Sequence, residues 1–185
     1  MIFSEQKVAQ MAAYFLHKRG GRMSYLKLMK LLYLSDREAM NRFEEPISFD
    51  RMVSMPHGPV LSQTYDLITG QIESQDWLDW IAGEANYEVS LKKQIHDLDQ
   101  LDELCRADIE IMDAVWNEFG GMTRFEIRDY THAHCPEWED PRGSSFPIDP
   151  RAVFQALGRT ADQADDNATR IRERKQLGAA LRSLQ

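Results

Sequence analysis

The segment that decides the fold reads Leu26-Lys27-Leu28-Met29-Lys30-Leu31-Leu32-Tyr33-Leu34-Ser35-Asp36. Leucines at 28, 31 and 32 follow helical spacing, and other large apolar side chains stand between them. A helix that is apolar on more than one face is buried from several sides. We therefore expect a central helix that begins at Ser24 and ends near Phe43, where Glu44-Glu45-Pro46 stops it.

Further helices are expected on both sides of this segment. They show apolar residues at helical spacing, start signals or stop signals, and the last of them is more polar than the others. Thr123 with Glu126 forms a capping box, and Asp149-Pro150 combines a good N-cap with proline at the first helical position. The expected helices are Ser4–Lys18, Leu101–Phe119, Arg124–Ala133, Pro150–Leu157 and Ala161–Leu184.

Two stretches interrupt the helical pattern. Ile47–Met55 lies between two prolines, and the apolar residues of Tyr87–Leu91 alternate with polar ones. Both features are typical of short strands. We expect the two stretches to pair as a hairpin-like patch on a helical body.

The sequence Pro56-His57-Gly58-Pro59 predicts a tight turn. Gly58 allows the backbone to turn sharply where a β-carbon would clash. Pro59 suits the first turn of a helix, since its missing N–H has no partner there in any case. We expect that helix to run through Ile68 and to stop at Gly70.

The predicted fold class is mainly α, a compact multi-helix bundle with a small two-stranded extended or β patch and a C-terminal helix. Residues 1–158 would form the helical domain. Residues 159–185 would form a basic C-terminal helix that packs on this domain or extends from it.

Composition indicates an ordinary globular protein. The 185 residues are 43% hydrophobic and 28% charged, which argues against disorder. Two cysteines make no disulfide framework and fit a reducing compartment. We see no signal peptide and no apolar run long enough to span a bilayer, so we expect a cytoplasmic protein without membrane contact.

The charge is unevenly distributed. The formal net charge of −8 disfavours broad binding to nucleic acid, because an acidic body repels phosphates. Residues 168–185 nevertheless carry five cations against one carboxylate, a net of +4. This tail is either a solvated helix face, a segment that folds back onto the acidic body, or a contact for an acidic partner.

Candidate chemical motifs are weak. His132-Ala133-His134-Cys135 holds zinc-ligand types, but the two histidines would diverge on a helix and no second ligand pair is visible. We expect His132 to hydrogen-bond within the core and His134 to face water. Cys135 with His132 or His57 could form a nucleophile and base, but nothing in the sequence brings them together. We predict no catalytic, metal or cofactor site, and no cofactor.

The central segment and two later motifs resemble one known family. The segment is similar to the pattern KL-x-KLLYFA-D of Panacea domains (SocA-like antitoxins), Gly58-Pro59-Val60 to the family's turn, and Thr131–Trp138 to its His…Trp signature. The resemblance covers about residues 5–157. The residues that carry it, to which we assign scaffold roles, are Lys30, Leu31, Leu32, Tyr33, Asp36, Gly58, Pro59, Val60, His132 and Trp138.

The resemblance implies an antitoxin, not an enzyme, that neutralises a cognate toxin by direct protein–protein binding. It also implies that some members act as adaptors that deliver the toxin to a ClpXP-type protease. The oligomeric state stays open. The residues expected to bind the partner are Phe49, Arg51, Met52, His57, Arg170, Arg172 and Arg174.

An alternative is a phage- or mobile-element-associated regulator that binds DNA through its Arg-rich last helix. Lysine and arginine contacts to phosphate make such binding strongly dependent on salt. A salt-sensitive shift of operator DNA would support this alternative.

Overall fold

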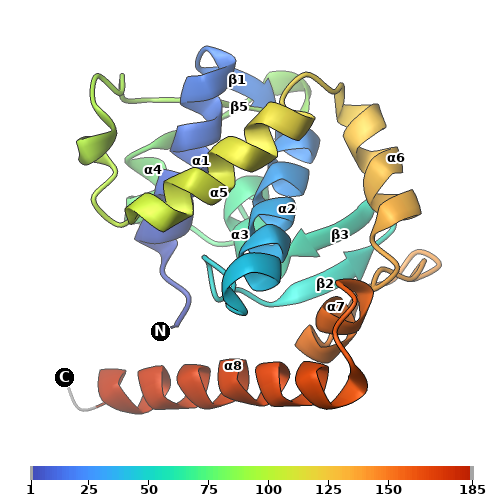
Figure 1. Cartoon of the computed structure of the whole chain (residues 1–185). Coiled ribbons are helices and arrows are strands. Elements are labelled where there is room, and N and C mark those ends of the chain that lie inside the picture. Colours follow the sequence, from blue (N-terminus) through green and yellow to red (C-terminus); the bar gives the residue numbers. More distant parts are fainter. Residues whose placement is uncertain (1, 184–185) are drawn as a thin grey trace.

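The structure is a computed structural model that describes residues 2–183 (Figure 1). Its α-helices are α1 (Glu5–Arg19), α2 (Tyr25–Phe43), α3 (Ser62–Thr69), α4 (Gln75–Leu78), α5 (Arg106–Phe119), α6 (Arg124–His134), α7 (Pro150–Ala156) and α8 (Ala161–Arg182). Its strands are β1 (Arg22–Ser24), β2 (Met52–Met55), β3 (Gly58–Leu61), β4 (Ile81–Glu84), β5 (Glu88–Leu91) and β6 (Phe146–Pro147). Short 3₁₀ turns occupy η1 (Ala85–Tyr87) and η2 (Leu98–Gln100).

Helix α2 is the centre of the fold, as the sequence predicts. It begins directly after Ser24 and ends at Phe43, and it packs against α1, α5, α6 and β3. Buried residues run without a break from Lys27 to Asp36, so the helix has no solvent-facing side over this stretch. Its burial on all sides explains why the segment lacks a simple amphipathic pattern.

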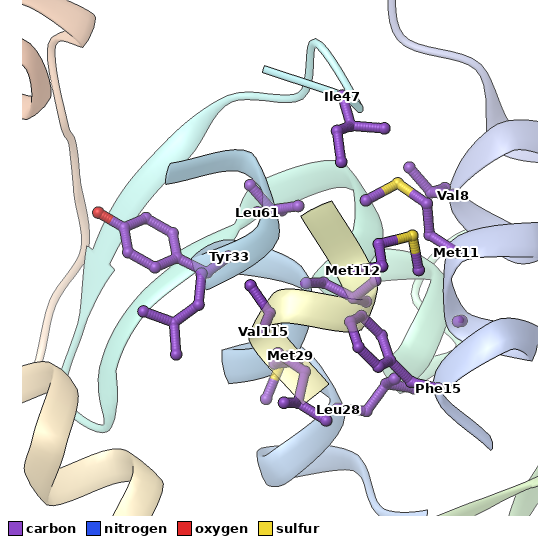
Figure 2. Packing of buried hydrophobic residues seen from close by; sticks show 14 of the residues in the cluster. Val8, Met11, Phe15, Leu28, Met29, Tyr33, Ile47, Leu61, Met112 and Val115 are labelled. Carbon is purple, nitrogen blue, oxygen red and sulfur yellow. The ribbon is translucent and has the colours of Figure 1, made fainter. Parts of the chain in front are cut away.

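The main hydrophobic core lies where α1, α2 and α5 meet (Figure 2). Sulfur-containing and aromatic side chains fill this contact, and Tyr33 lies apart with its hydroxyl directed away from it. Flexible methionine side chains fill irregular spaces between helices. The labelled members from these three helices are Val8, Met11, Phe15, Leu28, Met29, Met112 and Val115.

The predicted fold class is wrong in its β content. Residues 2–183 contain two three-stranded antiparallel sheets, ordered β1-β5-β4 and β3-β2-β6, where the sequence predicted one two-stranded patch. The predicted pairing is also wrong: β2 pairs with β3 and β6, whereas β5 pairs with β1 and β4. Strands of two to four residues are too short for alternation to identify them or to define their partners.

Strand β3 accounts for the largest local error. Pro59 lies in this strand opposite Ser54 and does not start a helix; α3 begins three residues later, at Ser62. Proline is tolerated here because β3 is at the edge of its sheet. All four residues of β3 are buried, so the strand shows no alternation of polar and apolar side chains.

Several predicted helix ends are confirmed. The capping box of Thr123 and Glu126 opens α6, Asp149 caps α7 with Pro150 at its start, and Ser4 caps α1. Helix α5 begins at Arg106 and not at Leu101, which is buried in a preceding turn. The predicted last helix matches α8 through Arg182, while Leu184 lies outside the described residues.

Helix α8 lies along one side of the molecule, at the bottom of Figure 1. Its first half packs on α7, and Ile171 is its last buried residue. Three of its arginines form ion pairs with carboxylates of the body: Arg170 with Glu44, Arg172 with Asp149 and Arg174 with Glu45. This part of the basic tail therefore folds back onto acidic residues, and the side chains remain about half exposed. Exposed pairs of this kind contribute about 0–1 kcal/mol each.

No helix within residues 2–183 combines the length and apolarity that a membrane crossing requires.

Candidate functional site

The β2–β3 turn rests on a cluster of polar side chains from α2 and α6. Gly58 adopts a left-handed backbone conformation (φ +96°) and lies against Lys30 and Thr131. A β-carbon at this position would come within 2.8 Å of Thr131 Oγ1 and 2.9 Å of Lys30 Nζ. Lys30 Nζ donates a 2.7 Å hydrogen bond to the Pro59 carbonyl. Only glycine lets the turn approach α2 and α6 this closely.

His132 and Trp138 flank the same turn. Their rings stack with centroids 4.1 Å apart and planes within 5° of parallel. Trp138 Nε1 donates to the Met55 carbonyl at 2.9 Å, which ties the loop after α6 to β2. The expectation that His132 hydrogen-bonds within the core is not met, because its buried Nε2 finds no partner among residues 2–183. Burial, followed by the nearby Lys30 charge, lowers the pKa of His132. His134 is exposed, as predicted.

Cys135 is buried, and burial raises the pKa of its thiol to about 12. A thiol of that acidity is a poor nucleophile near neutral pH. Residues 2–183 hold no group of three or more histidine, cysteine, aspartate or glutamate side chains that could bind a metal ion.

A buried ionic group links α2 to the loop after α6. Glu137 Oε1 accepts a 2.6 Å hydrogen bond from the Tyr33 hydroxyl and a 2.7 Å one from Arg37 Nε. The Glu137 side chain is fully buried, and that of Arg37 is 18% exposed. Burial and the neighbouring Glu137 charge raise the pKa of Tyr33 well above its usual range. Tyr33 thus has a structural role at the edge of the core.

Two aspartates organise the chain between α2 and β2. Asp36 accepts hydrogen bonds from the backbone N–H and the hydroxyl of Ser48, and burial raises its pKa to about 7. Asp50 accepts from the backbone N–H and the hydroxyl of Thr64 at the start of α3. Between them Phe49 is buried in the left-handed region (φ +54°). These contacts define the path of a segment that is irregular in the structure, whereas the sequence predicted it to be extended.

Lys30 gives a testable pH dependence. Burial lowers its pKa to about 7 in the folded protein, against 10.5 for an unperturbed lysine. Above about pH 7 the unfolded chain therefore binds more protons at this residue, and stability rises with pH. Relative to Lys30→Met, the wild-type free energy of unfolding should increase between about pH 7 and 9, by up to ~1.4 kcal/mol per pH unit. Urea titrations of both proteins measure this difference; a difference independent of pH would contradict the assignment.

Residues of the β2–β3 hairpin line two hollows. The first, of about 390 Å³, is bounded by β2, β6 and α8 and includes Arg51, Met52, Ile171 and Lys175. Arg51 is exposed, and Met52 is buried. Its lining mixes both charge signs, since Asp50 is also part of it.

The second hollow, of about 400 Å³, is lined by four aromatic side chains, Tyr25, Tyr65, Tyr87 and Phe125. They come from α2, α3, the β4–β5 turn and α6. We call this hollow the aromatic groove. Its other lining residues include Lys30, His57 and Arg124, but no aspartate or glutamate. The groove therefore combines apolar walls with the charge of the exposed Arg124 and no opposing carboxylate.

The structure brings some predicted site residues together and separates others. Lys30, Gly58, Pro59, His132 and Trp138 form the cluster under the β2–β3 turn. Three further motif residues, Leu31, Leu32 and Val60, are core, while Tyr33 and Asp36 belong to the two buried networks.

The residues predicted to bind a partner do not form one surface. His57 is in the aromatic groove, Arg51 and Met52 line the first hollow, and Phe49 is buried. Arg170, Arg172 and Arg174 lie on α8 in ion pairs.

Sequence reasoning missed the aromatic walls of the groove. Each aromatic residue stands alone in its own segment, so no motif joins them. One local signal existed. Tyr87 follows the polar, turn-forming Asn86, and an aromatic residue next to a turn is less able to pack into the core.

Comparison with known proteins adds one finding. A family model described as "Antitoxin SocA-like, Panacea domain" matches residues 28–139. The matched region runs from α2 to the residue after Trp138, so it includes the whole cluster under the β2–β3 turn. No curated protein and no solved structure matches the chain.

Proposed function

Because this chain belongs to the SocA-like antitoxin family, whose Panacea-domain model spans residues 28–139, we propose that it neutralises a cognate toxin by binding it directly. The mechanism is occlusion: the folded domain covers part of the toxin and blocks its active site or holds it in an inactive form. A stable interface of this kind buries about 1,600 Å² in total. No chemical step by this chain is required.

Binding is supported over catalysis because the polar motif residues make contacts within the fold. Lys30, Tyr33 and Asp36 are all buried, and each hydrogen-bonds to another part of the same chain. Their contacts join α2 to β3, to the loop after α6 and to the segment after α2. Side chains engaged in this way stabilise a scaffold. The exposed aromatic and charged residues are then the parts available to a partner.

The experiment is growth rescue. The protein encoded by the gene adjacent to this one is expressed from an inducible promoter, with and without this chain. We expect growth arrest by the neighbouring protein alone and recovery when both are present, with the two proteins co-purifying. Arrest that persists despite soluble co-expression would contradict the proposal.

The same cultures separate occlusion from proteolytic delivery. Occlusion leaves the toxin at an undiminished level in a stable complex. An adaptor for a ClpXP-type protease would instead lower the toxin level, and deletion of the protease would restore the arrest. We propose occlusion as the primary mode, and an immunoblot of the toxin during rescue distinguishes the two.

A further inference from the structure

We propose that the aromatic groove is the docking site for an acidic segment of the partner protein, one that carries an aromatic or aliphatic side chain beside its carboxylates. This inference rests on the proposed function, since it identifies where the toxin would be held. It moves the main contact away from the first hollow and α8, where most of the sequence-predicted partner residues lie.

The charge of the residues that line the groove favours an acidic segment. The chain carries a formal net charge of −8, yet the groove is lined by the exposed Arg124 and the buried Lys30, with no aspartate or glutamate. Three other hollows of the molecule each include at least one aspartate or glutamate. A positive group without a neighbouring carboxylate favours contact with acidic residues of a partner and disfavours contact with basic residues.

Arg124 is the cation best placed to pair with such a segment. It is exposed at the first position of α6, with its guanidinium 4.9 Å from the centre of the Phe125 ring. Among residues 2–183 it forms no ion pair, whereas the neighbouring Arg128 pairs with Asp129. An arginine stacked on an aromatic ring is preorganised to bind a carboxylate through two hydrogen bonds.

The floor of the groove also has unused hydrogen-bonding capacity. Ser24 Oγ is buried and has no partner in the described part of the chain, and Ser24 does not cap α2. The first turn of α2 contains no acidic residue that would offset the positive end of its dipole. Lys30 also lines the groove, and its Nζ donates one hydrogen bond, to the Pro59 carbonyl. Both atoms are shielded from solvent, so the exposed Arg124 is the first donor that a carboxylate would meet.

Two of the four aromatic walls are exposed in a way that folding alone does not explain. Tyr87 is 71% exposed and Phe125 is 49% exposed. Tyr87 and the preceding Asn86 both have φ of +61°, a left-handed conformation that is uncommon for tyrosine. Tyr87 packs edge-on against Tyr25 with ring centroids 5.6 Å apart. Tyrosine held in this position adds little to the core, but large exposed aromatic rings are typical anchors of protein interfaces.

The surroundings favour an extended segment of protein and define its direction. A third hollow, more open than the groove, adjoins it and shares Tyr25 and Tyr87 with it. Glu84 and Glu88 line this third hollow. A segment that follows both hollows would therefore place its acidic residues toward Arg124 and keep them away from these two glutamates.

The test measures binding of the purified neighbouring-gene protein to the full chain by calorimetry. We compare wild type with Arg124→Glu and Tyr87→Ala, and use Arg106→Glu on α5 as the matched charge control. Arg106 is 93% exposed, and among residues 2–183 its one ion pair is with Glu110 on its own helix. A glutamate at the start of α6 is compatible with the helix dipole, so Arg124→Glu should fold, which circular dichroism would check.

We expect Arg124→Glu and Tyr87→Ala each to raise Kd by about tenfold or more, with Arg106→Glu within about twofold of wild type. Wild-type affinity should fall as salt is raised, and this dependence should weaken in Arg124→Glu. Peptides tiling the neighbouring protein should bind only where carboxylates adjoin an aromatic or aliphatic residue.

Two results have different meanings. If wild type binds and rescues growth but both groove variants retain wild-type affinity, the docking site is wrong and the proposed function stands. If wild type neither binds nor rescues, the proposed function fails and the docking site fails with it.

Discussion

Replacing Gly58 with alanine is expected to destabilise the protein by about 3 kcal/mol, because two separate costs add at this position. The first is the left-handed backbone at φ +96°, which residues with a β-carbon rarely adopt. The second is steric: the new β-carbon would lie 2.8 Å from Thr131 Oγ1 and 2.9 Å from Lys30 Nζ. Thr131 and Lys30 are both buried and hydrogen-bonded, so neither can move aside freely.

Gly20→Ala is the matched control for this prediction. Gly20 has nearly the same φ, +90°, but a β-carbon there meets nothing within 4 Å. Gly20→Ala should lower the free energy of unfolding by about 1 kcal/mol, which is the conformational cost alone. Urea unfolding of the two variants gives the steric part as a difference of about 2 kcal/mol. Equal losses in the two variants would mean that the close contact under the β2–β3 turn does not exist.

Removing the carboxylate of Glu137 should cost about 3–5 kcal/mol, at least as much as the loss expected for Gly58→Ala. Glu137→Ala leaves the Tyr33 hydroxyl and the Arg37 guanidinium without their acceptor. Arg37 is mostly buried, so water replaces the lost partner only in part. The penalty is that of an uncompensated charge and an unsatisfied hydroxyl inside the protein.

Two further variants test the cause of that loss. Glu110→Ala removes a carboxylate from the exposed pair with Arg106 and should cost less than about 0.5 kcal/mol. The double variant Arg37→Met/Glu137→Leu removes both charges and should recover much of the stability that Glu137→Ala loses. If the double variant is as unstable as Glu137→Ala, the loss comes from packing and not from the unpaired charge. Denaturant midpoints by fluorescence measure all three.

Both predictions concern residues of the family motif or their direct partners, and both are predictions of stability. Gly58 and the partners of Glu137 act by holding the β2–β3 turn and the loop after α6 against α2. Tyr87 and Arg124, in contrast, are exposed, and their substitution should change binding and leave stability nearly unchanged. The separation of these two effects distinguishes the scaffold from the proposed docking surface.

The sequence alone determined the features that depend on local physics. The central helix from Tyr25 to Phe43 follows from its run of apolar residues and from the Pro46 that halts it. The start of α6 follows from the reciprocal hydrogen bonds of Thr123 and Glu126, and the start of α7 from Asp149 and Pro150. In each case the deciding residues lie within one or two helical turns, so the signal is complete in the printed sequence.

Only the tertiary structure decided which strands pair and where the hollows form. Pro59 is compatible with a helix start and with an edge strand, and burial of β3 against α2 selects the strand. The four aromatic walls of the groove run from Tyr25 to Phe125, and each is between 22 and 40 residues from the next along the chain. Contacts at such separations depend on how whole elements pack, and no local pattern encodes them.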